Sequence, residues 1–111
     1  MAWTTVCKKS ELAEGQGSYF DIGGREVAVF LHDGKPHVMD DLCPHAGGSM
    51  AEGWVEDRHG EACAVCPLHG WAFKLSDGEY ADMPGFEIRK FEARVQETDG
   101  EELVQADLPM P

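Results

Sequence analysis

Basic side chains are scarce in this sequence. Nine lysines and arginines stand against 21 aspartates and glutamates, which gives the chain of 111 residues a formal net charge of −12. Contacts to a phosphate backbone need a basic surface, so nucleic acid is not an expected partner. Most of this acidity favours solubility, and an acidic surface can also steer a protein toward a basic patch on a partner protein.

Long apolar runs are absent as well. No stretch approaches the ~20 consecutive apolar residues that a membrane-spanning helix needs. Residues 1–6 lack the basic segment and the apolar run of a secretory signal. From these absences we expect no membrane association and a cytoplasmic location. The length fits a single domain over residues 1–111.

Only four cysteines occur in the chain, and two of them stand apart from any motif. For these two, Cys7 and Cys63, the role of a small buried hydrophobic residue fits best. A disulfide between them stays open as an alternative, although a cytoplasmic location argues against it.

The other two cysteines each lie beside a histidine. One residue separates Cys43 from His45 in the stretch CPHAGG, and two residues separate Cys66 from His69 in CPLHGW. Zinc sites with two thiols and two imidazoles usually take both thiols from one segment and both imidazoles from another. One ligand of each kind per loop instead suits two irons, with the thiolates on one and the imidazoles on the other.

The pattern C-x-H followed by C-x₂-H, with Pro44 in the first stretch and Gly70 after the last histidine, resembles the Rieske family over about residues 3–106. The resemblance implies one [2Fe–2S] cluster as cofactor. It also implies an all-β, Rieske (ISP-like) fold, in which an antiparallel β-sandwich base carries a small cluster-binding subdomain. The implied metal and cofactor ligands are Cys43, His45, Cys66 and His69.

Turn signals divide the rest of the chain into short strands. Gly23-Gly24 and Asp33-Gly34 predict tight hairpin turns and therefore a three-stranded meander. Residues 86–97 predict the longest strand, with a bulge where the alternation of apolar residues breaks. The tail, residues 107–111, is expected to fray. The other predicted strands are 3–6, 19–22, 25–31, 36–40, 54–55, 63–65, 71–75 and 102–104.

Four positions predict a low redox potential. High-potential Rieske proteins have a serine directly after the His-Gly pair and a tyrosine two residues later, and the matching positions here are Trp71 and Phe73. The cysteines of the disulfide that joins the two loops in those proteins would fall at Gly48 and Leu68. Without the hydroxyl of a tyrosine at position 73, the potential should lie near the bottom of the Rieske range.

Other side chains receive plainer interpretations. Residues 82–85, Asp-Met-Pro-Gly, resemble the proline-containing loop that covers the cluster in this family. Trp3, Trp54 and Phe91 are expected in the core. The remaining histidines, His32, His37 and His59, are expected to be solvated turn residues.

The functional expectation is a soluble Rieske-type ferredoxin that passes one electron from a flavin reductase to a terminal oxygenase. The alternative is a small subunit that works with the large subunit of an NAD(P)H-dependent nitrite reductase. A zinc-stabilised interaction module is the alternative from another class. No stand-alone catalytic site is expected, because three turn histidines cannot supply the second iron site of an oxygenase.

Overall fold

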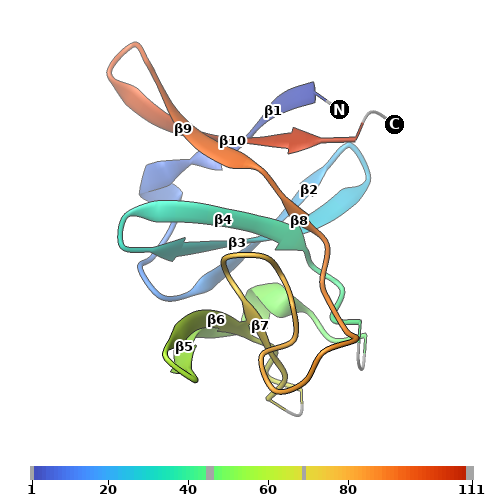
Figure 1. The fold of residues 1–111 in the computed structure, drawn as a ribbon. Helices are drawn as coiled ribbons and strands as arrows, with labels where there is room; N and C mark the ends of the chain where they lie inside the picture. The colour runs from blue at the N-terminus through green and yellow to red at the C-terminus, as the bar shows by residue number, and fades with distance from the viewer. Residues whose placement is uncertain (1, 45–46, 69, 110–111) are drawn as a thin grey trace.

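Three small antiparallel sheets form the described part of the chain, which covers residues 2–44, 47–68 and 70–109 of a computed structural model (Figure 1). The outer sheet has the order β1-β10-β9, the middle sheet β2-β3-β4-β8 and the third sheet β5-β6-β7. The described residues contain two short 3₁₀ turns and no α-helix. The strands are β1 (Ala2–Lys8), β2 (Gly17–Ile22), β3 (Arg25–His32), β4 (Lys35–Asp40), β5 (Trp54–Arg58), β6 (Glu61–Val65), β7 (Ala72–Lys74), β8 (Lys90–Phe91), β9 (Ala93–Thr98) and β10 (Glu101–Leu108).

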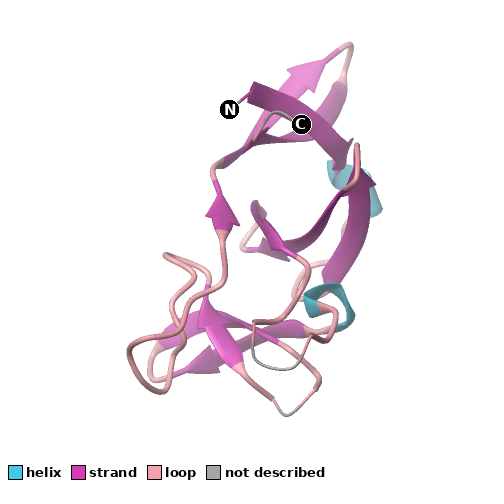
Figure 2. Ribbon diagram, turned by 90° about the vertical axis from the view of Figure 1, so that its right-hand side faces the viewer, coloured by secondary structure: helices cyan, strands magenta, loops and turns pink. Residues whose placement is uncertain are grey.

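Strand β3 of the middle sheet is buried on both faces along residues 27–31. Along β3, Val27 and Val29 pack toward the outer sheet, whereas Ala28 and Phe30 pack toward the third sheet. Because side chains alternate between the two faces of a strand, this double burial explains the unbroken apolar run of residues 27–31 within β3. The middle and outer sheets form the sandwich base, and the third sheet belongs to the smaller subdomain (Figure 2).

The predicted meander is confirmed. Strands β2, β3 and β4 follow one another through the two predicted turns. Gly23 and Gly24 have φ values of 61° and 94°, and Asp33 and Gly34 have 51° and 74°. Two consecutive residues with positive φ match the right-handed twist of the flanking strands, so these sequences make tight hairpins.

The prediction of one long strand over residues 86–97 is wrong. Two short strands begin within it, β8 at Lys90 and β9 at Ala93, and they belong to different sheets. Phe91 of β8 pairs with Val38 in the middle sheet, and Ala93 of β9 pairs with Ala106 in the outer sheet. The break in alternation lies just before β8, between Ile88, which packs in the core between the middle and third sheets, and Phe91, which packs in the core between the middle and outer sheets. The chain then crosses from the middle to the outer sheet at Glu92.

The tail is also more ordered than expected at its start. Asp107 and Leu108 belong to β10 and pair with Trp3 and Ala2 of β1. Leu108 is buried in the core between the outer and middle sheets. Burial of this leucine and the strand pairing explain why residues 107–108 do not fray. Among the described residues, no helix has the length and apolar content that crossing a membrane would require.

Two of the three expected core aromatics lie at the surface. Phe91 is buried as predicted, but Trp3 and Trp54 are each 41 % exposed. Trp3 stacks under the guanidinium of Arg94, 4.1 Å from the ring centre. The indole N–H of Trp54 donates to Glu56 on the edge strand β5. Each ring therefore meets a charged neighbour instead of the core.

Candidate metal centre

The first motif lies in the loop that follows β4. The N–H of Cys43 donates to the carbonyl of Gly48 at 2.8 Å, and the N–H of Gly47 donates back to the carbonyl of Cys43 at 2.9 Å. These two bonds fold the loop onto itself. They hold Cys43 in the apolar core between the middle and third sheets.

A buried carboxylate anchors this loop. Asp41 is 6 % exposed, and its Oδ1 accepts hydrogen bonds from the hydroxyl of Ser49 at 2.8 Å and from the N–H of Ala51 at 2.9 Å. Its backbone carbonyl accepts a third bond from the N–H of Met50. The sequence analysis did not predict that Asp41 anchors the loop. Its position between an apolar strand and the first cysteine could have indicated this role.

The second motif lies in the loop between β6 and β7. The N–H of Cys66 donates to the carbonyl of Trp71 at 2.8 Å and closes the loop. The backbone N–H of Leu68 lies close to the thiol of Cys66 and acts to lower its pKa. A backbone donor aimed at a cysteine sulfur stabilises the thiolate, which is the form that binds a metal.

The two loops bring their thiols together. The side chains of Cys43 and Cys66 are neighbours and lie in the same buried cluster. The pKa of the Cys66 thiol is raised: burial raises it most, the backbone N–H of Leu68 lowers it, and the neighbouring Cys43 raises it. Two buried thiols in contact form a soft donor pair of the kind that iron–sulfur clusters use, so the described residues fit such a group.

Gly48 lets the loops approach this closely. A Cβ atom at Gly48 would lie 3.2 Å from the Cβ of Leu68 and 3.4 Å from the Sγ of Cys66. The two positions at which high-potential relatives would carry their disulfide therefore do face each other here. A glycine and a leucine occupy them, so the loops are joined by packing rather than by a covalent bond.

The two predicted imidazole ligands, His45 and His69, lie outside the described residues, as does Ala46. Each of the two histidines belongs to a loop whose cysteine the structure places. The four-residue ligand set therefore stays a prediction, with its thiol half brought together in one place.

Aromatic side chains pack beside the second loop. Trp71 stacks on Tyr80 with ring centres 4.2 Å apart and meets Phe86 edge-on at 5.4 Å. Phe73 completes the group. The sequence analysis did not identify Tyr80 and Phe86 as part of this aromatic group. Their positions on either side of the Asp-Met-Pro-Gly segment could have indicated that they pack together.

The Asp-Met-Pro-Gly segment forms a loop held against the third sheet. The N–H of Tyr80 donates to the carbonyl of Phe86 and closes the loop. Asp82 accepts hydrogen bonds from His59 at 2.9 Å and from Arg58 at 3.0 Å, and the bond from His59 is the main reason that the pKa of Asp82 is lowered. This attachment fixes the loop to the end of β5 and the turn after it. That the loop covers the cluster remains a prediction.

The structure also places the remaining cysteines and histidines. Cys7 and Cys63 are free and buried in separate clusters, as the favoured interpretation expects, and burial raises the pKa of Cys7 to about 12.

His59 is exposed, but His37 is half-buried beside Lys90, so the expectation of a solvated turn residue is wrong for His37. Lys90 of β8 lies 3.4 Å from Nδ1 of this ring.

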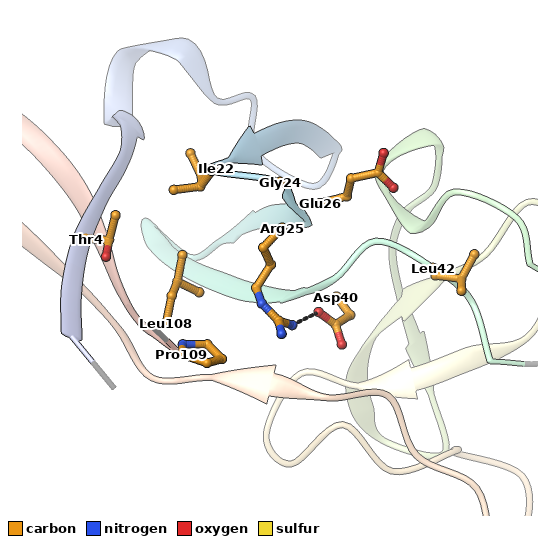
Figure 3. Close-up of a pocket in the computed structure, with 10 residues that line it drawn as sticks. Thr4, Ile22, Gly24, Arg25, Glu26, Asp40, Leu42, Leu108 and Pro109 are labelled. Atoms are coloured by element: carbon orange, nitrogen blue, oxygen red, sulfur yellow. Dashed lines mark hydrogen bonds and ion pairs between the residues drawn. The ribbon is translucent and has the colours of Figure 1, made fainter. Parts of the chain in front are cut away.

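A pocket of about 520 Å³ lies beside the start of the first loop (Figure 3). Ile22 and Leu108 give it an apolar side, and Leu42 stands at the end nearest the loop. Arg25 and Asp40 form an ion pair of 2.9 Å within it. This arginine is therefore already neutralised by a partner in the same pocket.

Comparison with known proteins identifies the family. Residues 2–92 match the family model described as Rieske [2Fe-2S] domain. The chain is 33 % identical over 84 residues to the 3-phenylpropionate/cinnamic acid dioxygenase ferredoxin subunit of Photorhabdus laumondii, covering 76 % of each protein. It superposes with a TM-score of 0.84 and 32 % identity on a Mycobacterium tuberculosis structure described as an NADH-dependent nitrite reductase small subunit, covering 98 % of this chain and 97 % of that one.

Some relatives are much longer than this chain. A cholesterol 7-desaturase of Hemicentrotus pulcherrimus is 34 % identical over 83 residues, which are 74 % of this chain but 17 % of that protein. The match of residues 2–92 to the Rieske [2Fe-2S] domain model favours an iron–sulfur cluster over the zinc alternative. The all-β fold, the paired thiols and the family match agree: the chain belongs to the Rieske [2Fe–2S] domain family and is an iron–sulfur electron-transfer protein with the cluster of that family.

Proposed function

We propose that this chain is a one-electron carrier whose cluster is held by Cys43 and Cys66 on one iron and by His45 and His69 on the other. The observation that carries the proposal is the contact between two buried thiols from separate loops. When bound, a Rieske cluster accepts and releases one electron at a time. The protein's part is to hold the thiolates in a dry core and to supply backbone donors such as the N–H of Leu68.

Exposed apolar side chains occur on the two cluster loops and on the loop that contains the Asp-Met-Pro-Gly segment. We call them the docking rim: Leu42, Leu68, Met83 and Phe86, of which Leu42 is the most exposed at 64 %. Leu42 directly precedes Cys43, and Leu68 follows Cys66 by two residues. Large apolar side chains exposed around a redox centre fit a transient docking surface, which buries a small area and releases its partner quickly.

The partners that we propose are a flavin reductase as donor and a terminal oxygenase as acceptor. The dioxygenase ferredoxin subunit among the relatives supports this choice. The net charge of −12 supports it as well, because an acidic carrier is steered toward basic patches on its partners. A single domain over residues 1–111 and a cytoplasmic location belong to the same proposal.

The second candidate is a small subunit bound to the large subunit of a nitrite reductase. One observation favours it: the TM-score of 0.84 with the nitrite reductase small subunit, over nearly the whole of both chains. The two candidates share every cluster residue. They differ in how long the partner stays bound.

The experiment follows the native protein in an extract of its source cells by gel filtration with antibody detection. A shuttle should elute near its own mass of 12.2 kDa. Its reduction by a flavin reductase should also slow steeply as salt rises, because screening weakens steering between exposed charges. Elution only with a large partner, together with salt-independent turnover, would favour the bound subunit and contradict the shuttle.

A further inference from the structure

A groove of about 440 Å³ lies on the sandwich base, where the start of β4 meets β8 and β9. Lys35, Lys90 and Arg94 line it, together with His37 and the indole of Trp3. Its lining residues belong to neither cluster loop. The one nearest in sequence to a predicted ligand is His37, six positions before Cys43.

The basic residues of this groove lack the carboxylate partners that most other basic residues of the protein have. Five of the nine basic residues form ion pairs with carboxylates: Lys8, Lys9, Arg25, Arg58 and Lys74. The other four form none with any carboxylate that the structure describes. Three of those four line the groove, and Glu92 is the one acid that lines it with them. A strongly acidic protein thus keeps a net positive groove.

Lys90 is the central cation. It is half-buried, its Nζ donates to the carbonyl of Leu75, and it lies 3.4 Å from Nδ1 of His37. The pKa of His37 is lowered to about 4, first by burial and then by Lys90, so this ring is neutral at pH 7. Burial also lowers the pKa of Lys90, and Asp77 opposes the shift. A half-buried ammonium whose two nearest partners are neutral gains from an added anion.

The groove also has an apolar wall. The ring of Trp3 is 41 % exposed, and the guanidinium of Arg94 lies 4.1 Å from its centre. Pro36 adds a second apolar surface. A volume of this size suits a small molecule, and a flat apolar body would cover the indole while its anionic group reached the lysines. The pocket of Figure 3 is different, because Arg25 there already has Asp40 as its counter-ion.

We propose that this groove binds a small organic anion, with a carboxylate or phosphate group between Lys35, Lys90 and Arg94 and a flat apolar group against Trp3. Such a site lies outside the cluster and its docking rim. An anionic metabolite could therefore bind to the carrier without contacting the redox centre.

The test is an amide chemical-shift titration of the oxidised cluster-loaded protein with benzoate, phenyl phosphate and uncharged benzamide. Benzoate and phenyl phosphate distinguish the two anion chemistries. Saturable shifts at Gly34, Glu92 and Ala93 with at least one of these anions, and none with benzamide, are expected. The double variant Lys35→Gln/Arg94→Gln should bind at least tenfold more weakly, and Glu92→Gln should bind more tightly.

The matched control is Lys8→Gln, which removes one positive charge from a residue paired with Glu101 elsewhere. It should bind like the unaltered protein. Both substituted residues of the double variant are exposed, so the fold should tolerate the change. The absence of saturable shifts with both anions up to ~10 mM, or equal affinity in the double variant and in the control, would overturn the proposal.

Discussion

At the scale of single residues, two cysteines three positions apart have different surroundings. Cys63 and Cys66 are both 0 % exposed. Cys66 meets the thiol of Cys43 and a backbone donor, whereas Cys63 belongs to a separate apolar cluster. Burial alone therefore does not distinguish a ligand from a core residue. What distinguishes Cys66 is the second thiol beside it.

This contrast predicts the outcome of a paired substitution. Cys66→Ser should abolish cluster assembly, since the iron loses a thiolate, and Cys43→Ser should do the same. Cys63→Ala is the matched control and should keep a full cluster. Iron, sulfide and the visible spectrum of the purified variants give the answer. Retention of the wild-type spectrum in either serine variant would refute the ligand assignment.

His37 predicts a pH dependence of stability. Its pKa in the folded protein is about 4, below the ordinary 6.5, because burial and Lys90 disfavour the charged ring. The unfolded chain therefore binds more protons between pH 6.5 and 4. The free energy of unfolding should then fall as pH drops through this window, by on the order of 2 kcal/mol once solvent screening of the half-buried ring is allowed for. It should not respond to this group above pH 6.5.

The variant His37→Gln isolates this effect. Urea unfolding of the variant and the unaltered protein at pH 7.5 and pH 4.5 should give a smaller loss of stability for the variant. Other acidic groups and the cluster contribute equally to both proteins, so the difference reports the histidine. Equal losses in the two proteins would show that the ring is protonated as easily in the folded state as in the unfolded one.

At the scale of elements, the two cluster loops are joined only by contact among the described residues. Gly48 and Leu68 face each other, and a Cβ atom added to the glycine would lie 3.2 Å from the Cβ of the leucine. Disulfides have Cβ atoms about 3.5–4.5 Å apart, so a shift of a few tenths of an ångström would admit one. The double variant Gly48→Cys/Leu68→Cys should form this bond and slow loss of the cluster on heating.

Leu68→Cys alone is the control, because it lacks the second thiol and should lose the cluster at least as fast as the unaltered protein. Thiol counting under denaturing conditions and the decay of visible absorbance measure both effects. Two free thiols at these positions under oxidising conditions would mean that the loops are farther apart than this packing indicates.

The elements also show how far the sequence could be interpreted. Tight turns such as Asp33-Gly34 carry a local conformational requirement, so the meander was predictable. The switch between sheets at Glu92 was not, because alternation along one strand says nothing about which neighbour each half pairs with. The thiol pair followed from the spacing of the motifs. The anchor Asp41 did not, because its partner Ser49 lies eight positions away across the loop.

At the scale of the whole molecule, the position that would carry a tyrosine in high-potential relatives is filled by Phe73, fully buried in the core. Without that hydroxyl the midpoint potential should lie near the bottom of the Rieske range, about −150 mV. Phe73→Tyr would add a donor near Cys66 and should raise the midpoint by about 40 mV, the equivalent of one hydrogen bond of about 1 kcal/mol.

A redox titration followed by visible absorbance measures both values. Phe73→Leu serves as the control, since it changes the packing without adding a hydroxyl and should leave the midpoint near that of the unaltered protein. A midpoint well above zero for the unaltered protein would contradict the argument from Trp71 and Phe73.

The ligation itself is tested most directly by electron paramagnetic resonance of the dithionite-reduced protein, with iron, sulfide and zinc measured on the same sample. We expect two irons and two sulfides per chain. We also expect a rhombic signal whose average g value lies below that of clusters ligated only by cysteine. A silent spectrum with one zinc per chain would contradict the cluster and its four ligands.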